Sequence, residues 1–391
     1  MPAPSISSND DLARYQELLR ESAQLRGTSL ARRAWQKLRR QWPAMTALGI
    51  LAVVVLLALL TPLLPLQPPR AVRLSSQYLP PQFGWGHPLF VESTGVPVSL
   101  DHTDAAELMA VGFGLPRAGA AATSEELGPL AAWLLRTRVR LWGAWSLNSL
   151  CGTDSLGRDL LSRICWGTRV SLLAATVATG VSLLIGVLYG AVAGLAGGWL
   201  DNLLMRIVDV LYSIPIIFVA IFLISILEAP NYRADLAKWG ISRMTIFYLV
   251  IGALYWLTMA RVVRGQVLSL KQQQFVEAAH ALGAGPWWII RKHLLPNCLS
   301  VVIVYLTLTI PNVLLTEAFL SFLGLGVQPP DVSWGLLANE GVKTINPIQI
   351  YWWLVLFPAV AIGLTLYSLN FLGDGLRDAL DPRLRKLTIK N

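Results

Sequence analysis

Six long apolar runs are the feature that most constrains the fold of this chain. A helix needs about 20 mostly apolar residues to cross the hydrocarbon core of a bilayer. The predicted spans are residues 44–64, 170–195, 207–227, 245–263, 299–322 and 351–372. Only 14% of the residues are charged, against about a quarter in a soluble domain. The sequence therefore predicts an all-α membrane protein with six transmembrane helices.

The distribution of basic residues predicts which side of the membrane each segment occupies. The net charge is +9, and lysine and arginine gather in residues 1–43, in the loop 264–298 and in residues 377–391. Six spans place these three regions on one side, and the positive-inside rule makes that side cytoplasmic. We therefore predict a basic cytoplasmic arm (1–43), a first transmembrane helix (44–65), a cytoplasmic tail (377–391) and no binding of nucleic acid.

Residues 66–148 are predicted to form a long extracytoplasmic insert, either a small packed subdomain or a partly ordered lid. Arginines in and after the insert conflict with the positive-inside rule, which holds best for short loops. They are Arg136, Arg138, Arg140, Arg158, Arg163 and Arg169, and the tryptophans of the insert are Trp85, Trp133, Trp142 and Trp145. Three cysteines exclude a disulfide framework, although one bridge between Cys151 and Cys165 is possible on this side.

Residues 265–298 form a polar segment between two apolar runs, with the pattern of two short helices. The first helix has one face at helical spacing, made of Phe275, Ala278, Ala279 and Leu282. Its alanines make the face thin enough for another protein to approach closely. We expect Gly283 to end this helix and Pro286 to begin the second. Trp287, Ile290 and Leu294 would line one side of the second helix, and Pro296 would end or kink it. An ordinary amphipathic loop on the membrane surface also fits this periodicity.

Several motifs occur in a fixed order along the chain. The pattern E-A-A-x-x-x-G runs from Glu277 to Gly283 and is followed by Leu295 and Pro296. This resembles the cytoplasmic coupling loop of ABC importer permeases. Further matches lie at residues 152–172, 198–209, 261–266, 320–335, 373–378 and 381–385. Together they resemble the C-type permease subunit of the oligopeptide/dipeptide (peptide/nickel) transport family over about residues 150–386. The insert departs from that family, whose first two spans have a shorter connection.

The resemblance implies a type I ABC importer permease core of five transmembrane helices in residues 149–376, preceded by one extra span. Such a subunit forms half of a peptide translocation pore in a bacterial inner membrane, with both termini cytoplasmic. Its partners would be a B-type permease, two ATP-binding subunits that hold ATP and Mg, a solute-binding protein, the peptide solute and membrane lipid. The residues implied in ATPase coupling are Glu277, Ala278, Ala279, Gly283, Leu295 and Pro296.

Polar residues in and after the fifth span are candidates for the pore or its gate. They are Asn312, Glu317, Gln328 and Trp334. A charge within a membrane span is costly and indicates function. Glu317 would either face a water-filled path or pair with an arginine near the outer surface. Arg261, at the end of the fourth span, can snorkel to the interface. Closely spaced glycines in the second span, such as Gly186, Gly190 and Gly194, favour helix packing over a pore-lining role.

Motifs that the sequence lacks narrow the function further. It contains no G-x-x-x-x-G-K-[ST] loop, no H-E-x-x-H and no G-x-S-x-G. We therefore predict a transport subunit that is not an enzyme and holds no cofactor or metal. A secondary transporter driven by an ion gradient is the alternative, but inverted repeats and ion sites are not evident. A membrane-anchored scaffold would leave the coupling motif without a purpose. Nickel complexes, glutathione and peptide antibiotics stay open as solutes.

Overall fold

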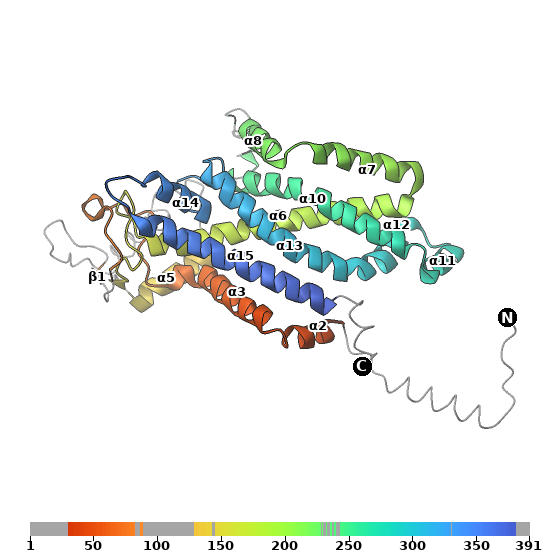
Figure 1. Cartoon of the computed structure of the whole chain (residues 1–391), viewed down its shortest axis with the longest axis horizontal. Helices are drawn as coiled ribbons and strands as arrows, with labels where there is room; N and C mark the ends of the chain where they lie inside the picture. Colours follow the sequence, from red (N-terminus) through yellow and green to blue (C-terminus); the bar gives the residue numbers. More distant parts are fainter. Residues whose placement is uncertain are drawn as a thin grey trace, which may run out of the picture.

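Long helices that run side by side make up most of the structure, a computed structural model (Figure 1). It describes residues 30–82, 87–88, 129–142, 145–227, 229, 232, 235–236, 238–239, 243–329 and 331–380. The helices are α2 (Leu30–Leu38), α3 (Trp42–Leu60), α5 (Pro129–Trp142), α6 (Leu160–Ala196), α7 (Gly198–Ser213), α8 (Ile216–Leu227), α10 (Arg243–Leu270), α11 (Gln274–Ala281), α12 (Pro286–Ile289), α13 (Leu295–Phe322), α14 (Trp334–Lys343) and α15 (Trp352–Leu380). Short elements are the 3-10 turns η1 (Thr61–Leu63) and η2 (Leu74–Ser76), the π-helical turn η3 (Ile290–Leu294) and the antiparallel strands β1 (His87–Pro88) and β2 (Trp145–Ser146).

The two ends of the bundle are the coupling end and the outer end. The coupling end carries α11, and the outer end carries α5, α14 and the start of α6 (Figure 1). Most of the predicted arm, the centre of the insert and the tail after Leu380 lie outside the described residues. The predicted domain limits therefore remain predictions.

The predicted class, an all-α membrane protein, is confirmed. Within the described residues, five helices are long and apolar enough to cross a membrane, and a sixth span results if α7 and α8 count as one broken span. These two helices meet at 88°. The break has a local cause: Ile214 precedes Pro215, and a residue before proline is driven into extended geometry, here with ψ of 127°. The second span begins at Leu160, ten residues before the predicted start at 170.

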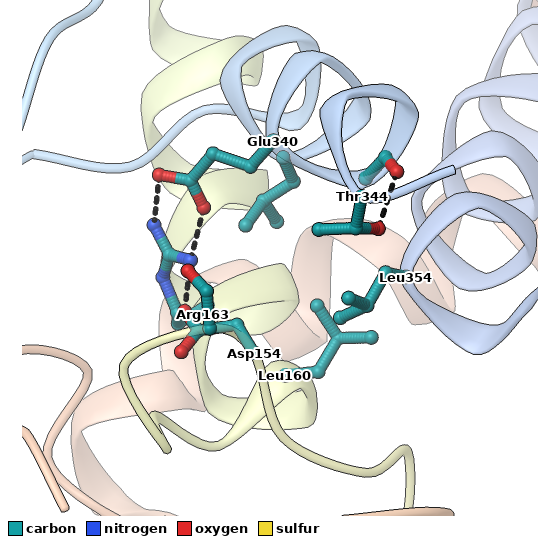
Figure 2. A pocket seen from close by; sticks show the side chains of 9 residues that line it. Asp154, Leu160, Arg163, Glu340, Thr344 and Leu354 are labelled. Atoms are coloured by element: carbon teal, nitrogen blue, oxygen red, sulfur yellow. Dashed lines mark hydrogen bonds and ion pairs between the residues drawn. The ribbon is translucent and has the colours of Figure 1, made fainter. Parts of the chain in front are cut away.

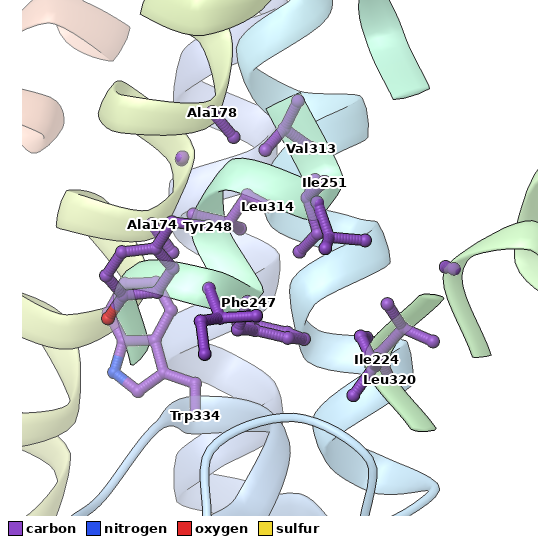
Figure 3. Packing of buried hydrophobic residues seen from close by; sticks show 14 residues of the cluster. Ala174, Ala178, Ile224, Phe247, Tyr248, Ile251, Val313, Leu314, Leu320 and Trp334 are labelled. Carbon is purple, nitrogen blue, oxygen red and sulfur yellow. The ribbon is translucent and has the colours of Figure 1, made fainter. Parts of the chain in front are cut away.

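Glycines of α6 serve close packing against α10, as the sequence favours. A Cβ atom at Gly186 would lie 2.6 Å from Met259 Cβ, and one at Gly194 would lie 2.8 Å from Val267 Cβ. Any larger residue would push the two helices apart. A second region of the core joins α6, α10, α13 and α14, where Phe247, Leu314 and other apolar side chains fill the space between the helices (Figure 3).

At the outer end, the described parts of the insert pack against the core. Ser162 Oγ of α6 donates to the Gln67 carbonyl at 2.5 Å, and the ring of Tyr78 stacks on Tyr351 with centroids 4.0 Å apart. The possible disulfide does not form, because Cys151 and Cys165 are both free. Cys165 points into the bundle as a buried residue of α6.

Candidate functional site

The loop between α10 and α13 presents an exposed apolar surface at the coupling end. In α11, Val276 and Ala279 are buried, whereas Glu277 and Ala278 are exposed. Of the four residues on the predicted face, Ala279 alone is buried. Phe275 is 38% exposed and Leu282 is 88% exposed. A face of this kind leaves apolar side chains in water unless another surface covers them.

The turn after α11 depends on Gly283. Its φ is +80°, a left-handed conformation that glycine adopts without a steric penalty. The Gly283 amide donates to the His280 carbonyl at 2.9 Å, and the Ala284 amide donates to the Ala279 carbonyl at 3.0 Å. These two bonds form a Schellman cap and satisfy carbonyls that the helix end leaves open. Among the described residues, no atom lies within 4 Å of a Cβ built at Gly283, so backbone geometry, not crowding, requires glycine here.

The helix that follows the turn does not end or kink sharply at Pro296, contrary to the prediction. Residues from Pro286 to Phe322 form one candidate span of 37 residues. The Leu295 amide donates to the Ile290 carbonyl, five residues earlier, which makes η3 a π-helical turn. Pro296 lies in the first turn of α13, and Asn297 Nδ2 donates to the His293 carbonyl at 2.7 Å. The wider turn and the amide side chain accommodate the proline within a continuous helix.

A buried cluster holds the loop rigidly to the ends of α10 and α13. It contains Val276 and Ala279 of α11 together with Ile289, Ile290 and Leu294, packed against Val263, Val267, Cys298 and Val302. Trp287 was predicted to share a face with Ile290 and Leu294, but it is 60% exposed, and Ile289 takes the buried position. We call the exposed set the coupling face: Phe275, Glu277, Ala278, Leu282, Trp287 and Trp288.

The four pore or gate candidates divide into two pairs. Glu317 and Trp334 are buried, whereas Asn312 and Gln328 are exposed. The Glu317 carboxylate accepts hydrogen bonds from Ser171 Oγ at 3.0 Å and Ser321 Oγ at 2.9 Å. Within the described residues it makes no ion pair with an arginine, one of the two alternatives from the sequence. The Trp334 amide donates to Ser171 Oγ at 3.3 Å, so one serine joins α6, α13 and α14.

Comparison with known proteins identifies the family. The family of binding-protein-dependent transport system inner membrane components matches residues 186–386. The chain belongs to this family of permeases. The N-terminal transmembrane domain of oligopeptide transport permease C matches residues 29–81. Family membership makes this permease a multi-pass membrane protein of an ATP-driven bacterial importer and a transport subunit, not an enzyme.

Individual relatives of the permease are similar in sequence over most of their own length. The dipeptide transport system permease protein DppC of Bacillus subtilis is 47% identical over 235 residues, which cover 60% of this chain and 69% of the relative. The oligopeptide permease OppC of Haemophilus influenzae is 44% identical over 60% of this chain and 70% of its own. The glutathione permease GsiD of Pectobacterium atrosepticum is 41% identical over 60% and 72%. Among solved structures, an inward-facing MetNI methionine ABC transporter is 22% identical, covers 57% of this chain and 98% of its own, and has a TM-score of 0.44.

One side of the permease carries polar side chains within its spans, and most of them were not predicted from the sequence. Tyr255 donates to the Asn312 carbonyl at 3.1 Å, and Tyr212 and Thr258 hydroxyls lie 3.2 Å apart. Arg261 does not simply snorkel: it pairs with Asp209 at 2.8 Å and lies 4.2 Å from the centre of the Tyr212 ring. The signal was available, because Tyr255, Thr258 and Arg261 recur at every third residue along one face of α10. Tyr255 also contacts the Thr316 hydroxyl. The polar stripe is the set made of Asp209 and Tyr212 of α7, Tyr255, Thr258 and Arg261 of α10, and Asn312 and Thr316 of α13.

The outer end of the permease holds a network of buried charges that no single motif predicted. Arg163 is 1% exposed; it contacts Asp154 at 2.6 Å and also pairs with Glu340 of α14 (Figure 2). Arg158 contacts the same two carboxylates, at 2.7 Å and 3.4 Å. Asp154, Arg163 and Glu340 line a small pocket, together with Leu160, Thr344 and Leu354. The network fastens α14 to the start of α6.

Asp159 lies beside this network and caps α6. Its Oδ2 accepts a hydrogen bond from the Ser162 amide at 2.8 Å. Burial raises the pKa of the Asp159 carboxyl to about 7, although its hydrogen bonds and Arg73 act in the opposite direction. Burial also raises the pKa of the Cys151 thiol to about 12, so this free cysteine is not an activated nucleophile.

Proposed function

We propose that this permease forms half of the translocation pore of an ATP-driven importer of peptides. The solute class is supported by its relatives, which are permeases of dipeptide, oligopeptide and glutathione transport systems. The observation that carries the mechanism is the exposed coupling face, capped by Gly283 and continuous with a membrane-spanning helix. A homologous B-type permease would supply the other half of the pore.

The coupling face would dock an ATP-binding subunit, and two such subunits would hold the ATP and Mg. Phe275, Leu282 and the two tryptophans supply apolar area, since aromatic anchors dominate protein interfaces. Glu277 is exposed beside Ala278 and can accept a hydrogen bond or an ion pair across the contact. The small alanine lets the partner's surface approach closely.

A displacement of this face would reach the membrane through packed elements. The buried cluster around Ile290 and Leu294 joins α11 to α10 and α13, so the loop moves with these helices. The continuous helix from Pro286 to Phe322 carries Asn312 and Glu317. ATP binding at a distant site would thereby bias two states of the pore, inward-facing and outward-facing.

The polar stripe on α7, α10 and α13 is the best candidate for the surface that faces the pore and the partner permease. Polar side chains are costly against lipid and are favoured where they face a cavity or another helix. Asn312 belongs to this stripe, whereas Glu317 and Trp334 would hold α13 and α14 in place behind it. Gln328 lies exposed just beyond the outer end of α13.

Orientation and the remaining partners complete the proposal. Both termini would be cytoplasmic in a bacterial inner membrane, and the outer end would face the solute-binding protein. The centre of the insert, residues 89–128, would contribute to that contact. Shortening residues 85–130 should then weaken stimulation of ATP hydrolysis by the binding protein while the permease pair still assembles. Loss of the permease pair in that deletion would instead indicate packing between the two permeases.

The test of coupling compares two glycines two residues apart. Gly283→Asp forces a side chain into a left-handed backbone, whereas Gly285→Asp places the same charge at φ −70°, in an N-cap position that favours aspartate. In proteoliposomes with the whole complex, we expect Gly283→Asp to lower peptide uptake by about tenfold while ATP hydrolysis continues. Gly285→Asp should keep most uptake.

The outcome separates geometry from charge. Equal loss of uptake in both variants would show that added charge, not turn geometry, disrupts the contact. Normal uptake by a stably inserted Gly283→Asp protein would contradict a docking role for this loop. A labelled panel of dipeptides, longer peptides, glutathione and a nickel complex in the same vesicles would identify the solute class.

A further inference from the structure

Helix α5 is placed at the outer end of the bundle by one buried arginine. The guanidinium of Arg138 donates to the carbonyls of Leu64 at 3.0 Å and Leu66 at 2.8 Å, just after the end of the first span. It also donates to the Trp145 carbonyl at 3.4 Å. Burial lowers the pKa of Arg138 to about 10, which leaves it charged near neutral pH. These bonds fix α5 beside η1, the last turn of the first span (Figure 1).

Several large apolar side chains of α5 and of the neighbouring β2 are exposed, on two sides of the helix. Trp133 is 60% exposed, Leu141 63% and Trp142 46%, and Trp145 in β2 is 57% exposed. Arg140 is exposed on the same helix. Soluble surfaces seldom gather so many exposed tryptophans without a partner that covers them. Residues 82–185, which include α5, lie between the two segments that match family descriptions.

The partner that best fits this surface is the lipid bilayer itself. The first span exposes Val53, Leu56 and Leu59, so its lipid-facing surface ends beside the buried turn η1, against which α5 packs. Tryptophan concentrates where hydrocarbon meets headgroups, because its ring is apolar and its N–H is polar. Arg140 follows Trp133 by seven residues and so lies on the same side of α5, where it adds attraction to phosphate.

We propose that α5 and Trp145 lie in the phospholipid headgroup region of the outer leaflet and anchor the C-terminal end of the insert to the membrane. The ligand is a phospholipid surface, which Trp133 and Arg140 would contact from one side of α5 and Trp142 and Trp145 at its C-terminal end. This anchoring would fix where the insert leaves the bilayer. It requires the membrane location of the family and no step of the transport mechanism.

The experiment measures contact between α5 and lipid in the full complex. A bimane label is attached to a cysteine at position 142 (Trp142→Cys) or, for comparison, at position 75 (Ser75→Cys). Ser75 is exposed and belongs to η2, and the carbonyl of the next residue, Ser76, accepts a hydrogen bond from Thr153. The parent protein, whose Cys165 and Cys298 are buried and whose Cys151 is half-buried, measures background labelling. Each complex is reconstituted in bilayers with phosphatidylcholine brominated near the headgroup end of its acyl chains, without solute-binding protein.

We expect at least about twofold stronger quenching at position 142 than at position 75. Arg138→Ala, which releases α5 from the end of the first span, should reduce the difference while the permease stays inserted. Equal quenching at both positions would overturn the proposal. Quenching at 142 in the permease alone that disappears on addition of the B-type permease would assign this surface to the partner and also overturn it. Loss of peptide uptake in Gly283→Asp would leave this result unchanged, so the two proposals fail separately.

Discussion

Both ends of the bundle are rich in arginine, but some arginines at the outer end are buried and paired, whereas several at the coupling end are exposed. At the outer end, Arg138 is 0% and Arg163 1% exposed, and both are held by carbonyls or carboxylates. At the coupling end, Arg39, Arg40 and Arg291 are exposed, and within the described residues they make no ion pair. The positive-inside rule concerns basic residues that are exposed to water and would have to leave it to cross the membrane. Arginines that are buried and paired therefore count little in it. For Arg138 and Arg163 the conflict with the predicted orientation therefore weakens, whereas Arg140 is exposed.

The largest effect that tests this comparison is expected from Arg163→Ala. The change leaves Asp154 and Glu340 with Arg158 alone, and breaking a buried ion pair costs about 3–5 kcal/mol. We expect a value at the lower end, because Glu340 is 29% exposed and water compensates it in part. Thermal unfolding of the purified permease, followed by reactivity of its buried cysteines, measures the loss.

Arg291→Ala at the coupling end is the matched control for this change. Its side chain is exposed, so the free energy of unfolding should change by less than about 0.5 kcal/mol. Similar losses in both variants would remove the distinction between the two ends.

Asp159 should make the outer end sensitive to pH. Its folded pKa of about 7 lies above its ordinary value of 3.8, so folding favours the protonated carboxyl. The contribution of this carboxyl to the free energy of unfolding is fully present below pH 3.8 and is lost as the pH rises towards 7. Between pH 5 and pH 7 the loss amounts to about 2–3 kcal/mol, at 1.36 kcal/mol per pKa unit. Asp159→Asn, which keeps the helix cap, should flatten this part of the pH profile of thermal unfolding.

Glu277→Gln removes a carboxylate from the coupling end and serves as the control. Because Glu277 is exposed, the variant should differ from wild type by less than about 0.5 kcal/mol at pH 5 and at pH 7. A wild-type profile that is already flat over this range would contradict the assignment to Asp159.

Arg138→Ala is expected to cost less, because carbonyls and not carboxylates lose their partner. The Leu66 carbonyl loses its arginine donor, which costs about 1–3 kcal/mol. The Leu64 carbonyl still accepts from the Leu66 amide, and water that enters at the outer end reduces the cost. Arg140→Ala, on the exposed side of the same helix, should leave the unfolding temperature unchanged. Limited proteolysis near residue 129 would report whether α5 has detached.

The smallest effect on stability is expected at the coupling end, where charge acts on orientation. The double variant Arg39→Gln, Arg40→Gln should change the free energy of unfolding by less than about 0.5 kcal/mol.

Membrane topology is tested with fused reporters. In wild type, reporters fused after Asn391 and within residues 100–120 should report opposite sides of the membrane. The double variant should increase the fraction of molecules that insert in the opposite orientation, whereas Arg158→Gln should not. The same side for both wild-type reporters would contradict six spans.

Patterns in short stretches of the sequence predict much of this structure. The spans follow from long apolar runs, and the end of α11 follows from a glycine placed where a left-handed residue is needed. Both depend on residues close in sequence, so the pattern alone is sufficient. The order of motifs likewise indicated the permease family and a peptide-type importer before any helix was placed.

Other features depend on residues far apart in the chain, and only the tertiary structure decided them. Glu317 meets Ser171, 146 residues away, and Arg163 meets Glu340, 177 residues away. Whether a charged side chain is buried, paired or exposed depends on what the fold brings to it, which no local window contains. Pro296 shows the same limit, since a π-helical turn packed against α10 and α11 keeps a helix continuous where its sequence predicts an interruption.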